Sequence, residues 1–494
     1  MTYIKKILSF FCCAALILSV TACGDKVPTE KVYFELPQIP TTADPQTASS
    51  AAELILVRNL FEGLLRYDNK GNITHGIAEE YSADGLTYTF KLREKAHWHT
   101  GEPVTANDFV FGLHRAIDPK TKSPFAFRLF SIKNAEAINK GKMSPDALGV
   151  TAVDKHTLTI TLCREDPDFL HNLTTAPFMP CNEKFFNESI GKYGLTQKHV
   201  LANGSYYMGK WNQEDFGIRL YRNAEYNGAF EALNGAVFLS HNPESTPLKE
   251  LTAETVDAAV LGAGEIEAAE KHGLSTASIE NICWVLTLGE DMNRDMRKSF
   301  AMLIDKQVFE ADLPDGFRPA DSLFPKALGV GPEVSGAGFM PYDPENAKKL
   351  FSASIKTYKD KKFPNTVLKY YSGAPIKNSI TSIVGHWQQN LSAFINIEAV
   401  ENPDVFLSQL TKPTMPMAVF PISADSPSLK DYLNLFGKTA NDSLAEVQKS
   451  ILAGNHIIPL AFQNTTIAYD SSLSGVKIEQ GNGYIDFSWV IKTK

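Results

Sequence analysis

Residues 78–119 read AEEYSADGLTYTFKLREKAHWHTGEPVTANDFVFGLHRAIDP and contain three kinds of local structure in succession. The dipeptide Asp84-Gly85 is typical of a tight turn between two strands. From Leu86 to Leu92 apolar and polar residues alternate, which predicts a half-buried strand. A helix is then predicted to begin after Thr105, whose side chain can cap it, and to end before Pro119. This stretch therefore predicts a hairpin that leads into a helix, and it contains no catalytic arrangement.

The order of these residues resembles a signature of the solute-binding proteins of peptide-type ABC transporters, which is DGLTYTF, then LR, then W-x-x-G-x-P-x-T-A-x-D-F-V. Here the three parts are Asp84–Phe90, Leu92-Arg93 and Trp98–Val110. The pairing of Ile138–Lys142 with Leu148–Val150 resembles the oligopeptide-binding subgroup. Other stretches resemble the same family along nearly all of the mature chain: the Asp-Pro turn at 44–45, FEGLL at 61–65, NGSY at 203–206, RNAEY at 222–226 and GYIDF at 483–487.

The resemblance implies an α/β protein with the bilobal periplasmic-binding-protein fold, class II and of the large three-domain type, whose ligand cleft lies between the lobes. The expected parts of the chain are a lipoprotein signal peptide (1–22), a tether (23–31), a discontinuous lobe I (32–61, 185–274 and 462–494), an inserted domain II (62–184) and a lobe III (275–461).

Residue patterns in the second half independently favour a mixed sheet covered by helices, because strands alternate with helices there. Strands are predicted at 366–371 and 395–400, with a helix at 380–391 between them. Residues 282–288 form an apolar run that is typical of a strand buried on both faces. Longer helices are predicted over 53–65 and 294–309.

The first 23 residues are predicted to be an export signal. Lys5-Lys6 precede Ile7–Val20, an apolar segment too short to be a good membrane-spanning helix. The sequence Val20-Thr21-Ala22-Cys23 then resembles a bacterial lipobox, in which Cys23 becomes the lipidated first residue of the mature protein. A polar stretch follows Cys23, which favours a lipoprotein over an ordinary signal peptide with a coincidental cysteine.

Composition excludes some classes of protein. The chain has 494 residues, 44% hydrophobic and 21% charged, with a formal net charge of -8, which argues against nucleic acid as the main partner. Cys163, Cys181 and Cys283 follow Cys23. In an oxidising compartment Cys163 and Cys181 could pair, but three buried free thiols are the favoured interpretation. No cysteine or histidine spacing suggests structural zinc.

Peptide capture needs main-chain groups presented as a strand edge and a carboxylate for the α-ammonium group of the peptide. The family places this carboxylate in an Ala-Asp step after a strand, so the resemblance implies that Asp425 contacts the ligand, with Ser423 and Ala424 beside it. The alternative for Asp425 is an exposed turn residue. Pro421-Ile422 stands where the family usually has Gly-Trp or a similar pair, which removes an N–H and an aromatic surface.

The opposing edge would come from the residues after the Asp-Pro turn, Ser49 and Ser50, followed by two alanines. This assignment is positional, and a plain lead-in to the following helix is the favoured interpretation. His97 and His99 flank Trp98 without a nearby third ligand, so no metal site is expected. Asp166 and Asp168, on either side of a proline, are interpreted as a loop and not as an acid pair.

The resemblance implies a substrate-binding protein of an ABC importer that binds oligopeptides between its lobes. It is not expected to be an enzyme, since no nucleophile elbow or phosphate-binding loop is present. Its expected partners are a peptide, permease subunits with cytoplasmic ATPases and a membrane reached through the lipid anchor. It is expected to be monomeric and extracytoplasmic, with no cofactor. A peptide-signal receptor, a binding protein for a nickel chelate or an oligosaccharide, and a secreted hydrolase stay open as alternatives.

Overall fold

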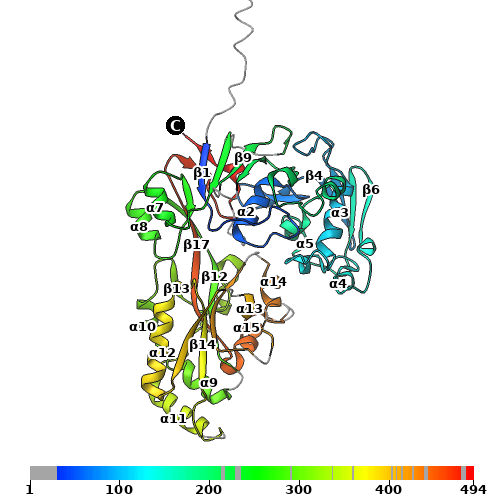
Figure 1. Cartoon of the computed structure of the whole chain (residues 1–494). Helices are drawn as coiled ribbons and strands as arrows, with labels where there is room; N and C mark the ends of the chain where they lie inside the picture. The colour runs from blue at the N-terminus through cyan, green and yellow to red at the C-terminus, as the bar shows by residue number, and fades with distance from the viewer. Residues whose placement is uncertain are drawn as a thin grey trace, which may run out of the picture.

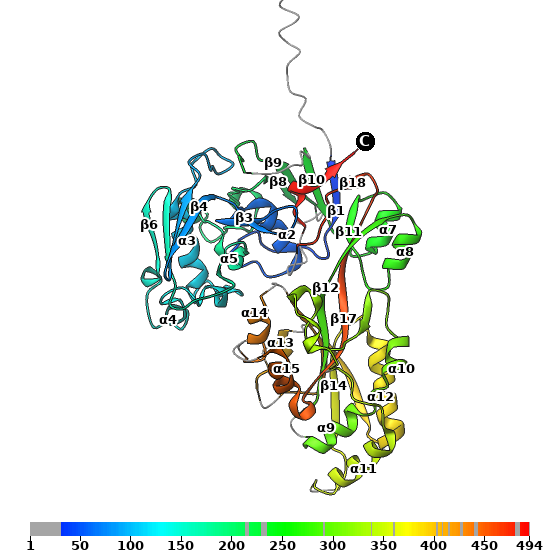
Figure 2. The same cartoon turned by 180° about the vertical axis from the view of Figure 1, so that it is seen from behind.

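The computed structural model describes residues 31–494 except 213–216, 229–234, 290–291, 337, 359–360, 402–403, 408, 413–414, 425–427, 439–442, 480–484 and 494. It has two lobes joined by two long strands, β12 (Ser275–Thr287) and β17 (Ile457–Tyr469) (Figures 1 and 2). We call the part formed by residues before β12 and after β17 the upper lobe, and the part between them the lower lobe. The predicted two-lobed α/β architecture is therefore present.

One large sheet runs through both lobes. Its strands besides the two long ones are β1 (Lys31–Glu35), β8 (Tyr206–Asn212), β9 (Gly217–Arg222), β10 (Ala236–Ser240), β11 (Ala258–Val260), β13 (Phe317–Pro319), β14 (Thr366–Tyr371), β15 (Ile395–Val400) and β16 (Ala418–Ser423). Among the described residues the order is β15-β14-β16-β12-β17-β11-β1-β10-β9-β8, and β13 lies beside β17. The upper strand β1 is parallel to β10 and β11, and the lower strand β14 is parallel to β15 and β16.

The two long strands connect the lobes. They pair antiparallel from Ser275 opposite Tyr469 to Thr287 opposite Ile457. The register shifts at Glu280/Ile282, between the part of β12 that belongs to the upper sheet and the part that pairs with β16. Such a bulge bends and twists a strand. The bend therefore lies where the chain passes from one lobe to the other.

The lower lobe buries β12 and β16 on both faces, because successive side chains of a strand point to opposite sides. Trp284 and Leu286 belong to one apolar cluster, and Cys283 and Val285 belong to the other. Helices cover both faces: α9 (Arg294–Ala301), α10 (Lys306–Ala311), α11 (Pro344–Ile355) and α12 (Lys377–Leu391) on one, and α13 (Asp404–Leu407), α14 (Leu429–Asn434) and α15 (Leu444–Leu452) on the other (Figure 1). The predicted doubly buried strand is confirmed.

The upper lobe carries a second, four-stranded sheet in the order β4-β5-β7-β6. The hairpin of β4 (Ala78–Asp84) and β5 (Thr87–Leu92) turns at Gly85, whose φ of 58° suits glycine. Phe90 and Leu92 of β5 are buried, as the alternation predicted. The capping interaction of α3 (Ala106–Ile117) is also present. The remaining elements are β2 (Leu65–Tyr67), β3 (Ile73–His75), β6 (Val150–Asp154), β7 (Thr157–Thr161), β18 (Leu473–Ser474), β19 (Ile491–Lys492), α4 (Ala135–Asn139), α5 (Phe169–Asn172), α6 (Glu183–Glu188), α7 (Pro247–Thr252) and α8 (Ile266–Lys271).

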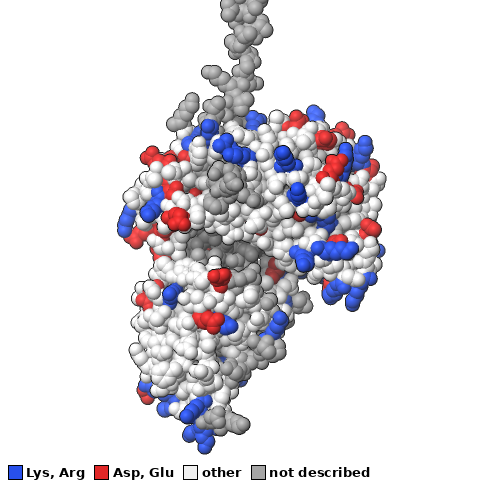
Figure 3. All heavy atoms as spheres, viewed as in Figure 1, with Lys and Arg blue, Asp and Glu red and all other residues white. Residues whose placement is uncertain are grey.

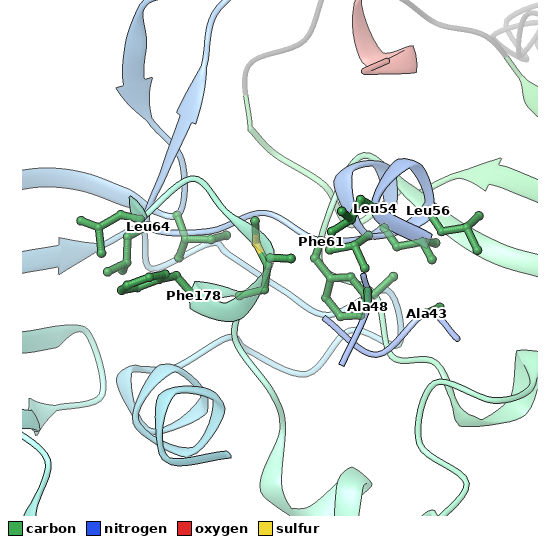
Figure 4. Packing of buried hydrophobic residues seen from close by; sticks show 14 of the residues in the cluster. Ala43, Ala48, Leu54, Leu56, Phe61, Leu64 and Phe178 are labelled. Atoms are coloured by element: carbon green, nitrogen blue, oxygen red, sulfur yellow. The ribbon is translucent and has the colours of Figure 1, made fainter. Parts of the chain in front are cut away.

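Three predicted helices have different bounds in the structure, the smallest difference being that α12, predicted over 380–391, begins at Lys377. The first, α2 (Ala51–Leu60), ends before Phe61 and does not reach residue 65. Phe61 takes an extended conformation, and a side chain at Gly63 would come within 2.7 Å of the Leu173 carbonyl oxygen. The segment after α2 is thus packed against residues 173–179 within the same apolar core as Leu54 and Phe178 (Figure 4). The helix predicted over 294–309 is two helices, because Asp305 caps α10.

Candidate functional site

Strand β16 has one edge with a neighbour along only part of its length. Its pairing with β12 covers Ala418–Ser423, whereas in the described part of the chain its pairing with β14 joins only Ala418 and Val419. The Ala424 N–H donates to the Asn281 carbonyl at 2.7 Å, so Ala424 turns its main-chain groups toward β12. The alternation of an antiparallel ladder then turns those of Ser423 the other way. Ser423 therefore offers an N–H and a C=O to an edge where a further extended chain could pair.

The same alternation shows on which edge of β16 the missing N–H of Pro421 matters. Pro421 lies opposite Trp284 at a position whose main-chain groups point away from β12. Its missing N–H therefore costs the β12 ladder no hydrogen bond. The donor is missing instead on the open edge, where Pro421 offers only its carbonyl group.

A cavity of about 130 Å³ lies beside the end of β16. Ser423 and Ala424 line it from the lower lobe together with residues of α14, and Phe125, Phe127 and Arg128 line it from the upper lobe. The structure therefore brings two predicted site residues to a cavity between the lobes. The third, Asp425, lies outside the described residues. A larger cavity, about 350 Å³, lies beside Ala277 and Ser278 of β12, and no predicted site residue lines it.

Three polar contacts connect the upper lobe to the start of α14, and we call these six residues the lobe seam. Lys430 Nζ lies 2.8 Å from Asp166 Oδ1, the Ser428 hydroxyl donates to Asp168 Oδ2 at 2.6 Å, and Arg128 Nε lies 3.5 Å from Asp431 Oδ2. Ser428 also caps α14, since its oxygen accepts the Asp431 N–H at 3.1 Å. The cavity is therefore closed on one side by contacts between the lobes.

Burial and neighbouring charges determine the pKa values of two seam carboxylates and of His171, whose pKa Arg128 also affects. Burial opposes the ionisation of Asp166, but the hydrogen bonds from Lys430 and Ser131 outweigh it and lower its pKa. For Asp431 burial dominates over the attraction of Arg128, so its pKa is raised. Burial, with a smaller contribution from Arg128, lowers the pKa of His171 to about 3, so this ring is neutral at pH 7.

Ser49 and Ser50 lie at the start of α2, and neither lines the cavity beside the end of β16. The backbone N–H groups of both serines donate to Glu53 Oε2 at 3.0 Å. The Ser50 side chain caps the helix by accepting the Glu53 N–H at 3.3 Å. Burial raises the pKa of Glu53, but these hydrogen bonds and those from Thr41 lower it overall. The two N–H groups are thus occupied within the chain, and a ligand contact at Ser49 and Ser50 stays a prediction.

Several signature segments meet at one buried carboxylate, Glu62. Its Oε1 accepts hydrogen bonds from Tyr226 Oη at 2.5 Å and Arg66 Nη1 at 3.1 Å, and its Oε2 accepts one from Arg93 Nη2 at 2.5 Å. The Asn203 side chain donates to the Glu62 carbonyl at 2.9 Å. The segments FEGLL, LR, NGSY and RNAEY therefore join through this residue, so their role is to hold the upper lobe together.

His97 and His99 have hydrogen-bond partners within the chain, and three cysteines of the described residues form no disulfide. His97 Nδ1 lies 2.6 Å from the Lys95 carbonyl, and His99 Nδ1 accepts the Ala202 N–H at 3.1 Å. Cys163, Cys181 and Cys283 are free thiols, and Cys181 and Cys283 are buried as predicted. The predicted burial is wrong for Cys163, which is exposed because it lies in the loop after β7. In the described ranges no group of three or more metal-ligating side chains is found, and no helix is long and apolar enough to cross a membrane.

Sequence reasoning missed the lobe seam. Asp166 and Asp168 lie in a loop, as predicted, but their partners are 260 or more residues away in the chain. Nothing local in either segment indicates this pairing. Figure 3 shows acidic and basic side chains on both lobes of the face that it presents.

A protein with two lobes, an open strand edge and a cavity between the lobes belongs to the class of bilobal binding proteins. Residues 72–443 match the family of bacterial extracellular solute-binding proteins, family 5. The chain belongs to this family, which confirms the predicted family, the predicted fold and the predicted role as an extracytoplasmic solute-binding protein.

Individual relatives agree with this assignment. The chain is 29% identical over 422 residues to the periplasmic murein peptide-binding protein MppA of Escherichia coli (strain K12), which covers 80% of this chain and 77% of that protein. The structure of Listeria monocytogenes OppA bound to peptide has a TM-score of 0.78 at 23% identity, covering 94% of this chain and 100% of that one. The pheromone receptor PrgZ also has a TM-score of 0.78, at 22% identity, with coverage of 94% and 100%.

Proposed function

We propose that this protein binds oligopeptides between its lobes and delivers them to the permease of an ABC importer. The open edge of β16 at Ser423 carries the proposal, because pairing with a strand edge holds a peptide through its main chain without reading its side chains. The similarity to a murein peptide-binding protein supports a peptide as the ligand. The protein acts without covalent chemistry and is not an enzyme.

Asp425 is proposed to bind the α-ammonium group of the peptide. It follows Ser423 and Ala424 directly in the chain, and these two residues line the cavity between the lobes. A charge-assisted hydrogen bond in a closed site is short and directional, which fixes the register of the peptide on β16. Ser49 and Ser50 are proposed to contact the ligand from the upper lobe. Because their N–H groups are taken by Glu53, they would do so through other atoms.

Lobe closure accompanies binding in this proposal. The lobe seam supplies polar contacts that form only when the upper lobe meets α14, and the bulge in β12 supplies a bend between the lobes. A ligand that contacts both lobes favours the closed arrangement by its differential affinity for it. Affinity should therefore depend on the seam as well as on direct contacts.

The setting of the protein is proposed from its sequence. Cys23 carries the lipid anchor after removal of residues 1–22, and residues 23–31 form the tether. The mature protein is proposed to be a monomer. It consists of lobe I (32–61, 185–274 and 462–494), domain II (62–184) and lobe III (275–461), and works with permease subunits and cytoplasmic ATPases.

Native mass spectrometry of the purified protein, followed by denaturation and sequencing of what is released, tests the proposed function. A ladder of co-purified short peptides is the expected result. In Asp425→Ala this ladder should be lost or strongly reduced. The matched control is Asp154→Ala, which removes a carboxylate that accepts the His156 N–H on the exposed β6–β7 hairpin.

Other outcomes have distinct meanings. A single non-peptide mass, such as a nickel chelate or an oligosaccharide, would keep the binding fold and overturn the peptide. Equal peptide ladders in both variants would remove Asp425 from the site and leave peptide binding in place. An empty protein that also ignores a mixed peptide library would contradict the proposed function.

A further inference from the structure

The cavity at the end of β16 is lined by residues of both lobes, several of them aromatic. Phe125 and Phe127 form the upper wall, and Ala424, Tyr432 and Leu435 contribute to the lower one. Most of this lining is apolar. Because the walls come from both lobes, the cavity is complete only where the lobe seam is formed.

One side of the cavity carries two charged groups with unused hydrogen-bonding capacity. Arg128 Nε and Asp431 Oδ2 are buried and make no hydrogen bond, although they lie 3.5 Å apart. The Arg128 side chain is only 6% exposed. Its guanidinium carbon lies 4.6 Å from the ring centre of Phe125 and 5.9 Å from that of Phe127, so stacking holds the group in place.

Unused buried donors and acceptors are costly, and a bound group that satisfies them contributes to affinity. Arg128 Nε offers an N–H and Asp431 Oδ2 offers an acceptor. A peptide unit carries the complementary pair, a carbonyl oxygen and an N–H. The apolar space beside them therefore suits a residue whose side chain is apolar and whose main chain lies at the charged side.

The volume of the cavity limits the size of the peptide side chain that it can hold. An engineered apolar cavity of about 150 Å³ holds a benzene molecule. A cavity of about 130 Å³ is of similar size, so it suits a leucine or phenylalanine side chain. Since the peptide main chain takes up Arg128 Nε and Asp431 Oδ2 in this arrangement, a charged side chain would lose its hydration in this space and find no remaining partner among the apolar walls.

We propose that this cavity takes an apolar side chain of leucine or phenylalanine size from the bound peptide, and that the protein consequently selects peptides with such a residue at one position. The inference rests on the proposed peptide-binding function and adds a specificity-determining pocket to it. Leu435 sets the depth of the pocket from the α14 side, and Phe125 and Phe127 close it from the upper lobe.

The test measures affinity by isothermal titration calorimetry with the full chain. The probes are an all-alanine pentapeptide and a panel in which leucine, phenylalanine, tryptophan, glycine or glutamate replaces one alanine at each position in turn. The wild-type protein should bind the leucine or phenylalanine peptide at one position roughly tenfold or more tightly than the all-alanine peptide, from the apolar area buried. At that position the glutamate peptide should not gain affinity.

Two variants change the pocket in opposite directions. Leu435→Trp fills it and should abolish the preference while affinity for the all-alanine peptide changes by no more than about twofold. Leu435→Ala enlarges it and should move the preference toward tryptophan. Leu444→Trp is the matched control, since Leu444 packs partly buried in the same apolar cluster but does not line the pocket. Thermal denaturation confirms that each variant is folded.

The possible results test the proposed pocket and the proposed peptide-binding function separately. If wild-type protein binds all members of the panel equally, peptide binding stands and the pocket is wrong. If Leu435→Trp keeps the preference, the side chain binds elsewhere and the pocket is again wrong. If wild-type protein binds no peptide, both the pocket and the proposed function fail.

Discussion

The carboxylate of Asp168 accepts a hydrogen bond of 2.6 Å from the Ser428 hydroxyl, although the two residues are 260 positions apart in the chain. Ser428 caps α14 of the lower lobe, and Asp168 precedes α5 of the upper lobe. This bond and its neighbour between Asp166 and Lys430 connect the lobes independently of β12 and β17. The seam is thus the place where closure can be altered without changing the long strands.

We predict that removing the Lys430 side chain destabilises the lobe seam more than neutralising Asp166 does. The Asp166 side chain is 1% exposed and that of Lys430 is 33% exposed. Lys430→Ala leaves a buried carboxylate without its cation, whereas Asp166→Asn leaves a lysine that water can still solvate. Hydrogen exchange of the α14 amides should therefore be faster in Lys430→Ala than in Asp166→Asn. Lys140→Ala, which breaks an exposed pair with Glu136, is the control and should leave α14 unchanged. Exchange as slow as that of the wild type in both seam variants would show that the pair does not hold the lobes together, and equal acceleration in both would contradict the predicted asymmetry.

A second prediction concerns Glu62. Replacing it with alanine leaves Arg66 and Tyr226, both buried, without the carboxylate they share. Breaking a buried charged network by removing one partner typically costs about 3–5 kcal/mol. We expect Glu62→Ala to lower the free energy of unfolding by about this amount in urea denaturation, and Glu62→Gln to lower it less. The exposed Glu80→Ala should have almost no effect. A loss below about 1 kcal/mol in Glu62→Ala would contradict the network's role in stability.

A third prediction follows from the raised pKa of Asp431. Burial is the largest cause, Arg128 and Lys430 oppose it, and Asp168 and Asp166 add to it. A carboxyl whose pKa is higher in the folded state binds its proton more readily when folded, so its contribution to stability falls as the pH rises through that pKa. The stability of Asp431→Asn relative to wild type should therefore increase as the pH rises through that pKa, independently of the constant cost of leaving Arg128 without its carboxylate. Below about 4, the unfolded pKa of aspartate, Asp431 is protonated in the folded and the unfolded chain alike, and the stability difference should no longer change with pH. Thermal denaturation across pH checks this, and a stability difference that does not change with pH would exclude titration of Asp431 as its cause.

The sequence was sufficient for features that depend on local pattern. The strand of residues 366–371 and that of 395–400 have the predicted bounds, because apolar periodicity and flanking polar residues determine them. The end of α2 was mispredicted, since the close approach of Gly63 to Leu173 is a tertiary contact. The seam was not predicted for the same reason. Ser423 and Ala424 were placed at the site only through the family resemblance, and the open edge beside them depends on sheet order, which periodicity does not give.

The last prediction concerns Pro421, which the structure places opposite Trp284 with its main-chain groups on the open edge of β16. Pro421→Ala adds an N–H on that edge without disturbing the β12 ladder. If a peptide pairs there, the new donor should add one hydrogen bond, worth about 0.5–1.5 kcal/mol, or an increase in affinity of roughly two- to tenfold. Loss of the proline should meanwhile lower stability by about 0.4–1 kcal/mol through the unfolded chain. Calorimetry with the co-purified peptides measures the first effect and urea denaturation the second. Pro332→Ala, at the start of a short 3-10 helix in the lower lobe, is the control and should change stability alone. Unchanged peptide affinity in Pro421→Ala would mean that the ligand does not extend along β16 as far as residue 421.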